Sequence, residues 1–250
     1  MEYLTLGGSF MAKIFEYVPY EEYNPIMQRV ESCISKIYDE VSEDIDFGWN
    51  FVGSANRYGV AFITRRINGN KGFDFDVNLY VQNPDENNYW KAKYLRTQFY
   101  LAIQKVFKKY GYQDPEDRTS VIRVKMVDKK DSKIIHSIDF AIFQDIRNAD
   151  GEFIEKYARK YDNGSYGWTT RGGKNDEALE KLEWLNKNIG DNGNQKYPYW
   201  YSEDFSLLDD LKQEYLKLKN NNNDEEKCSF QLFNEAINNI YNQWQQWINK

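Results

Sequence analysis

The sequence predicts an α+β fold, in which a mixed sheet is flanked by helices and followed by a C-terminal helical lobe. Apolar and polar residues alternate strictly over residues 73–81, the pattern of a half-buried strand. Segments with helical spacing lie on both sides of that run, but they do not alternate regularly with strands as in a doubly wound sheet. After residue 148 the composition shifts towards Gly, Asn and Tyr, and then to helical patterns. We therefore expect a core over residues 1–150 and a mainly helical lobe over residues 151–250.

The first half of the core begins with a helix and continues with extended segments. Residues 24–41 carry apolar side chains at steps of three and four, which predicts a helix, with Pro25 in its first turn. The short apolar run from Phe47 is typical of a strand that stops at a glycine turn, Gly53-Ser54. A second extended run covers residues 58–66, and a loop rich in Asn and Gly leads from it to the alternating strand.

The remaining elements follow from the same periodicities. Helical spacing covers residues 88–111 and ends at Gly111. Two strand-like runs, 120–127 and 133–143, are joined by a charged turn and predict a hairpin. Three further helices are expected over 175–189, 204–219 and 229–249. The last helix has an apolar stripe that we expect to pack against the core: Phe230, Phe233, Ile237, Ile240, Trp244 and Trp247.

Size and charge restrict the classes of partner. The 250 residues carry a formal net charge of -6, so the chain offers no global positive field, and long nucleic acids are disfavoured partners. Two cysteines are too few for a disulfide scaffold or a zinc motif, and both are expected to stay reduced. The first residues lack the pattern of a signal peptide, and no stretch reaches the length of a membrane span. We expect a cytoplasmic protein without a membrane partner.

Three aspartates are the candidates for chemistry. Asp74 and Asp76 lie on the polar face of the alternating strand, and Asp139 lies between Ile138 and Phe140 in an apolar strand. An acidic pair on a polar strand face is common, so the interpretation depends on the order of the three pieces: Gly-Ser turn, acidic pair, buried aspartate. A buried carboxylate without a partner is costly, and a metal ion would remove that cost. Three such carboxylates can hold two divalent cations about 3.5–4 Å apart, and Mg²⁺ suits oxygen ligands.

The series Gly53-Ser54, Asp74-x-Asp76 and Asp139 resembles the signature of the nucleotidyltransferase superfamily, which includes DNA polymerase beta, CCA-adding enzymes, antibiotic nucleotidyltransferases and cyclic-nucleotide synthases. The resemblance covers roughly residues 45–145 and implies a nucleotidyltransferase-like catalytic core in residues 1–150. It implies metal-dependent transfer of a nucleoside monophosphate from a nucleoside triphosphate to a hydroxyl acceptor, with Mg²⁺ or Mn²⁺. It also implies that Gly53 and Ser54 bind the triphosphate. Asp74 and Asp76 would hold both metals, while Asp139 would hold the catalytic metal and help to deprotonate the acceptor.

The chain departs from this pattern in one respect, because the segment between Ser54 and Asp74 is longer than usual. The single histidine, His136, lies three residues before Asp139, on the opposite strand face, and is expected to be structural. Basic residues that could meet the triphosphate, and aromatic residues that could stack a base, come from the C-terminal half: Arg171, Lys174, Lys196, Tyr166, Trp168, Tyr197, Tyr199 and Trp200.

The acceptor stays open, because this superfamily places many substrates on one metal core. The first hypothesis is an enzyme that transfers the nucleotide to a small molecule or another nucleotide, which agrees with the acidic net charge. The second is a catalytically inactive nucleotide- or partner-binding protein with the same fold, which the lengthened segment favours. The third is a transferase acting on transfer RNA or on a protein.

Overall fold

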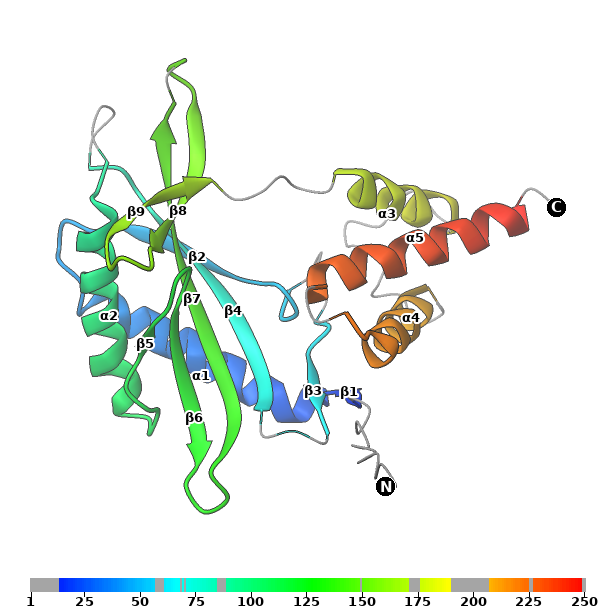
Figure 1. Cartoon of the computed structure of the whole chain (residues 1–250), viewed down its shortest axis with the longest axis horizontal. Coiled ribbons are helices and arrows are strands. Elements are labelled where there is room, and N and C mark those ends of the chain that lie inside the picture. The colour runs from blue at the N-terminus through cyan, green and yellow to red at the C-terminus, as the bar shows by residue number, and fades with distance from the viewer. Residues whose placement is uncertain are drawn as a thin grey trace, which may run out of the picture.

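The computed structural model describes residues 14–56, 61–67, 69, 71–84, 89–148, 150–170, 176–189, 207–224 and 227–248. It confirms a mixed α+β architecture (Figure 1). The elements in chain order are β1 (Phe15–Tyr17), α1 (Tyr20–Tyr38), β2 (Phe47–Val52), β3 (Thr64–Arg66), β4 (Lys71–Val81), α2 (Ala92–Lys108), β5 (Glu116–Asp117), β6 (Ile122–Asp128), β7 (Lys133–Arg147), β8 (Phe153–Lys160), β9 (Tyr166–Thr170), α3 (Asp176–Ile189), α4 (Leu207–Asn221) and α5 (Ser229–Ile248).

The main sheet has seven strands and is mixed. Its central order is β2-β4-β7-β6-β5, and the β8–β9 hairpin extends it because β8 pairs with the end of β7. Strands β4 and β7 run parallel, whereas all the other neighbours in this sheet are antiparallel. The predicted strand at residues 73–81 and the hairpin of residues 120–143 are confirmed as β4, β6 and β7.

Helices α1 and α2 cover one face of this sheet. Alternate residues of β4, Phe73, Phe75, Val77 and Leu79, are buried against them together with Ile138 and Phe140 of β7. Because successive side chains of a strand point to opposite faces, Asp74, Asp76 and Asp139 lie on the other face. The strict alternation in the sequence therefore decides which face is core and which face carries the carboxylates.

The C-terminal helices build a second hydrophobic cluster. Residues of α3, α4 and α5, among them Leu182, Tyr215 and Phe233, are buried together there. Phe62, from the segment between the Gly-Ser turn and β4, belongs to this second cluster, whereas its neighbour Ile63 belongs to the sheet core. The lengthened segment thus links the two clusters. The boundary between residues 150 and 151 stays a prediction, and β8 and β9 lie on its C-terminal side.

Several details differ from the sequence predictions. Helix α1 begins at Tyr20, so Pro25 lies inside the helix rather than in its first turn. Of the run 58–66 only Thr64–Arg66 is a strand, because Phe62 and Ile63 point into two different cores; residues 57–60 lie outside the described part. The hairpin β8–β9 was not predicted. In the stripe of α5, Phe233, Ile237 and Ile240 are buried, but Phe230 in the first turn is 46% exposed.

Gly111 ends the region of α2 as predicted, since its φ of +85° is a conformation that glycine adopts readily. Among the described residues, the structure contains no helix with both the length and the apolar character needed to cross a membrane.

Candidate active site

The three predicted aspartates share one face of two neighbouring strands. Asp76 on β4 and Asp139 on β7 are register partners across the parallel pair, and Asp74 lies opposite Ser137 one step back along the same face. Asp139 is 8% exposed, Asp76 is half-buried and Asp74 is exposed. The register therefore places an acidic group where two strands of the sheet centre meet.

The glycine turn closes against this group. Val52, the last residue of β2, is in register with Asp76, and the chain then turns at Gly53 with a φ of +62°. A Cβ atom on Gly53 would lie 2.2 Å from Oδ2 of Asp76, so no other residue fits without moving the carboxylate. The turn is fixed from the far side as well, because the backbone N–H of Phe62 donates to the carbonyl oxygen of Ser54 at 2.7 Å. Glycine is thus required here both for its backbone conformation and for its lack of a side chain.

The buried Asp139 has a partner that sequence analysis did not single out. Arg123 on β6 is its register partner and binds both carboxylate oxygens: Nε donates to Oδ1 at 2.5 Å, and Nη2 donates to Oδ2. Hydrogen bonding to Asp139 is the main cause that raises the pKa of Arg123, and the charges of Asp74 and Glu116 add to it. The cost of burying Asp139, which we had assigned to a metal ion, is therefore offset in this structure by a bidentate ion pair.

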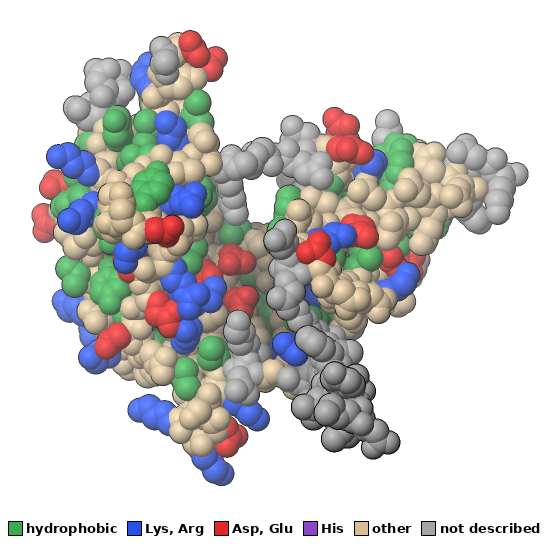
Figure 2. Space-filling model, viewed as in Figure 1, with side chains coloured by type: hydrophobic (Ala, Val, Ile, Leu, Met, Phe, Trp, Pro, Cys, Tyr) green, Lys and Arg blue, Asp and Glu red, His purple; other side chains and the backbone are tan. Residues whose placement is uncertain are grey.

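The row of charged residues continues to the edge of the sheet. Glu116 on β5 is the register partner of Arg123, and it accepts hydrogen bonds from Lys125 and from Arg118, the latter at 2.5 Å and 2.8 Å. The Lys125 hydrogen bond is the main cause that lowers the pKa of Glu116. Figure 2 shows Lys and Arg side chains gathered beside Asp and Glu side chains on this side of the sheet. Within the described residues, no three or more His, Cys, Asp or Glu side chains are already arranged to hold a metal ion.

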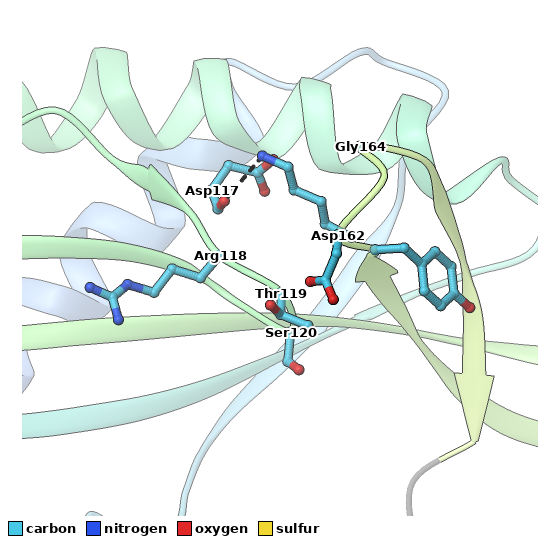
Figure 3. Close-up of a pocket in the computed structure, with 8 residues that line it drawn as sticks. Asp117, Arg118, Thr119, Ser120, Asp162 and Gly164 are labelled. Carbon is cyan, nitrogen blue, oxygen red and sulfur yellow. Dashed lines mark hydrogen bonds and ion pairs between the residues drawn. The ribbon is translucent and has the colours of Figure 1, made fainter.

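A polar pocket of about 540 Å³ lies elsewhere, between the segment after β5 and the β8–β9 turn. Lys160 and Asp117 form an ion pair at its margin, at 3.2 Å, and the carboxylate of Asp162 extends towards Thr119 and Ser120 (Figure 3). None of the residues predicted from the sequence lines this pocket. We therefore place the candidate active site at the carboxylates and not at this pocket.

The aromatic candidates in the described part of the C-terminal half make structural contacts. The hydroxyl of Tyr166 donates to Asp117 at 2.7 Å, and Nε1 of Trp168 donates to the carbonyl oxygen of Trp90 at 2.9 Å. Both contacts fix β9 to neighbouring elements, and stacking of a nucleotide base on either ring stays a prediction. The other basic and aromatic candidates lie outside the described residues: Arg171, Lys174, Lys196, Tyr197, Tyr199 and Trp200.

His136 lies in the core, on the face opposite Asp139, as predicted. Its ring stacks near Phe73, with 5.8 Å between ring centroids, and Nε2 shares a hydrogen bond of 2.8 Å with the hydroxyl of Tyr112. Burial lowers the pKa of His136 from 6.5 to about 4, and the charge of Arg29 acts in the same direction. The histidine is therefore neutral at pH 7 and serves packing.

The buried histidine predicts a loss of stability in acid. Because its pKa is lower in the folded chain than in the unfolded chain, the unfolded chain takes up the proton first as the pH falls. The contribution is complete above pH 6.5 and is lost as the pH falls towards 4, by about 3 kcal/mol in the free energy of unfolding. Urea unfolding of the wild type and His136→Phe between pH 7 and pH 4 measures the difference. If the free energy of unfolding falls equally with pH in the two proteins, the low pKa of His136 is contradicted.

Comparisons by sequence found no match: no protein-family model matches the chain, and no curated protein matches it. Solved structures resemble it at low identity. Vibrio cholerae DncV bound to 3′-deoxy ATP matches with a TM-score of 0.49 and 13% identity over 89% of this chain and 52% of that one. Escherichia coli DncV bound to 3′-deoxy GTP gives 0.49 and 14% over 90% and 54%.

A third match is the Elizabethkingia meningoseptica CdnE cyclic dinucleotide synthase with GTP and Apcpp, at a TM-score of 0.46 and 11% identity over 87% of this chain and 69% of that one. This chain thus spans about half the length of the two DncV chains.

Proposed function

We propose that the protein is a metal-dependent nucleotidyltransferase, which transfers a nucleoside monophosphate from a nucleoside triphosphate to the hydroxyl group of a small molecule or of another nucleotide. The observation that carries this proposal is the register of Asp76 with Asp139, closed by Gly53 against the Asp76 carboxylate. Asp76 and Asp139 thus lie side by side on one face of two neighbouring strands, and two-metal phosphoryl transfer uses carboxylates placed in this way.

The donor set suits Mg²⁺ or Mn²⁺, since carboxylate oxygens are the ligands that these hard cations take in proteins. Asp74 and Asp76 would hold both cations, and Asp139 would hold the one nearer the acceptor. When bound, the cations neutralise charge on the phosphates and align the attacking and leaving oxygens. Asp139 is held by Arg123 in this structure, so its full use as a ligand requires that ion pair to open.

The chain itself supplies the positioning. Backbone N–H groups of the turn at Gly53 and Ser54, and the Ser54 hydroxyl, would donate to phosphate oxygens of the bound triphosphate. The hydrogen bond from Phe62 to Ser54 fixes this turn and ties it to the C-terminal cluster, in which Phe62 is buried. We infer that the helical lobe shapes the acceptor side, because its core reaches the turn through this residue.

Incubation with each labelled nucleoside triphosphate and Mg²⁺ or Mn²⁺ tests the proposal. We expect release of pyrophosphate and a labelled product, whose structure would identify the acceptor when candidate acceptors are supplied. Metal-dependent binding of a triphosphate without pyrophosphate release, whatever the acceptor, would instead favour the catalytically inactive binding protein. If the wild type neither binds nor converts any triphosphate, the proposal fails.

Gly53→Ala is expected to lower the rate of nucleotidyl transfer by about 10²-fold, because displacement of a catalytic group by about 1 Å has an effect of that size. The new methyl group clashes with Oδ2 of Asp76, and the turn requires the alanine to adopt a positive φ. Gly48→Ala is the matched control: Gly48 lies in β2, the strand that leads to the turn, and a Cβ there would have nothing within 4 Å. We expect the control to keep wild-type activity. Equal rates for Gly53→Ala and Gly48→Ala would show that the turn does not position Asp76.

A further inference from the structure

Arg123 stands between two carboxylates in one row of the sheet. It is in register with Asp139 on one side and with Glu116 on the other. In this structure its guanidinium binds both oxygens of Asp139, and its side chain is 25% exposed. Asp74 adds a further negative charge close enough to affect Arg123. The guanidinium therefore lies against the acidic group formed by Asp74, Asp76 and Asp139, on the side of β6.

This arrangement conflicts with a bound cation. Two hydrogen bonds from Arg123 use both oxygens of Asp139, the carboxylate that the proposed function assigns to a divalent cation. Two positive groups on one partly buried carboxylate repel each other strongly. A lysine could relieve the conflict by losing its proton, but the guanidinium of arginine stays charged. A cation at Asp139 therefore competes with Arg123, and its binding is favoured when the guanidinium moves away.

We propose that Arg123 is an internal counter-ion that exchanges with the divalent cation at Asp139, an inference that rests on the proposed function. Without the cation, Arg123 neutralises Asp139 and binds the carboxylate that the cation would use. When the cation binds, the guanidinium leaves Asp139 and turns towards Glu116, its partner on the other side. Glu116 already pairs with Lys125 and Arg118, but its side chain is 39% exposed, whereas that of Asp139 is 10% exposed. Water and salt therefore screen the added positive charge better at Glu116 than at Asp139. Arg123 is in this sense a positioning residue, and it sets the affinity for the cation.

Direct measurement of Mn²⁺ binding tests this exchange. Replacing Arg123 by methionine keeps the length of the side chain and removes the charge that Mn²⁺ must displace. We expect Arg123→Met to bind Mn²⁺ about tenfold tighter than the wild type, since a neighbouring like charge is removed. Loss of the free Mn²⁺ signal in electron paramagnetic resonance gives the affinity. Arg118→Met is the matched control: Arg118 is paired with Glu116, as Arg123 would be after exchange, but is not bound to Asp139, and we expect a change below about twofold.

Arginine side-chain NMR follows the movement itself. The Nε–H resonance of Arg123, identified by its loss in Arg123→Met, should shift when Mg²⁺ is added to the wild type. Arg96 is an internal reference, because its guanidinium is 3% exposed and is bound to Asp117 rather than to one of the proposed cation ligands. We expect the chemical shift of Arg96 Nε–H to be unchanged by Mg²⁺.

The outcomes separate this inference from the proposed function. Unchanged or weaker Mn²⁺ binding by Arg123→Met, or a fixed Arg123 resonance in the Mg²⁺-bound protein, overturns the exchange while leaving the proposed function standing. If neither the wild type nor Arg123→Met binds Mn²⁺, both proposals fail. Should Arg123→Met not fold, Arg123→Lys takes its place, because lysine makes one contact where arginine makes two. Tighter Mn²⁺ binding by Arg123→Lys supports the exchange, and equal or weaker binding overturns it.

Discussion

Asp76→Asn is expected to lower the rate of nucleotidyl transfer by about 10³-fold or more, because metal-ion stabilisation of the transition state amounts to several kcal/mol. The substitution keeps the shape of the side chain and removes the charge that the cations need. Asp76 is in register with Asp139, and its carboxylate lies against the Gly53 turn, so it stands between these two parts of the site. Pyrophosphate release at saturating triphosphate and Mg²⁺ measures the effect. Asp131→Asn, in the exposed β6–β7 turn, is the control that should keep wild-type activity.

Stability separates this loss from misfolding. Asp76→Asn keeps the shape of the side chain, so we expect a folded variant with the circular dichroism spectrum of the wild type. Asp139→Asn should unfold at a lower temperature than the wild type, because it breaks the ion pair with Arg123. Thermal unfolding without metal compares the two variants. Loss of activity in a folded Asp76→Asn protein assigns the effect to the carboxylate, and full activity would remove Asp76 from the mechanism.

The part of the fold that could be predicted from the sequence is the part in which one periodicity dominates. Strand β4 buries every second residue against α1 and α2, so its alternation is strict and predicts both the strand and its polar face. Strands β8 and β9 lack this signal, because Ala158 is the only residue of the two strands that is fully buried. Similarly, the segment with Phe62 and Ile63 serves two cores at once, so its apolar run predicts a longer strand than the described residues 61–66 form.

The partner of Asp139 could not be predicted because it depends on a register shift. The turn of the β6–β7 hairpin pairs Asp128 with Lys133, and continuing that register would place Arg123 opposite Ile138. An irregularity between Met126 and Val127 moves the pairing by one residue and places Arg123 opposite Asp139. The alternation of charged Arg123 and Lys125 with apolar neighbours predicts that both lie on one face, but not which residue of β7 they meet.

A second large effect is expected far from the carboxylates, at Arg96 in α2. Its guanidinium donates to Asp117 through Nε at 3.0 Å, to the carbonyl oxygen of Ala158 at 2.9 Å and to those of Arg118 and Val121 at 2.5 Å and 3.1 Å. Burial would raise the pKa of Asp117, but hydrogen bonds from Tyr166 and Arg96 outweigh it and hold that pKa below its usual value. One side chain thus joins α2 to β5, to the segment after it and to β8.

Arg96→Met is expected to lower the free energy of unfolding by about 3–5 kcal/mol, the usual effect of removing one partner from a buried ion pair. The variant leaves three backbone carbonyl groups without the guanidinium donor, and Asp117 keeps only Tyr166 and Lys160 as partners. Arg96→Lys should recover only part of the loss, since an ammonium group cannot reproduce the planar fork that reaches all four acceptors. Arg118→Met removes an exposed ion pair of the same region and should cost less than about 1 kcal/mol. Urea unfolding at pH 7 compares the three variants, and a similar loss for Arg96→Met and Arg118→Met would show that Arg96 does not hold the hairpin to the sheet.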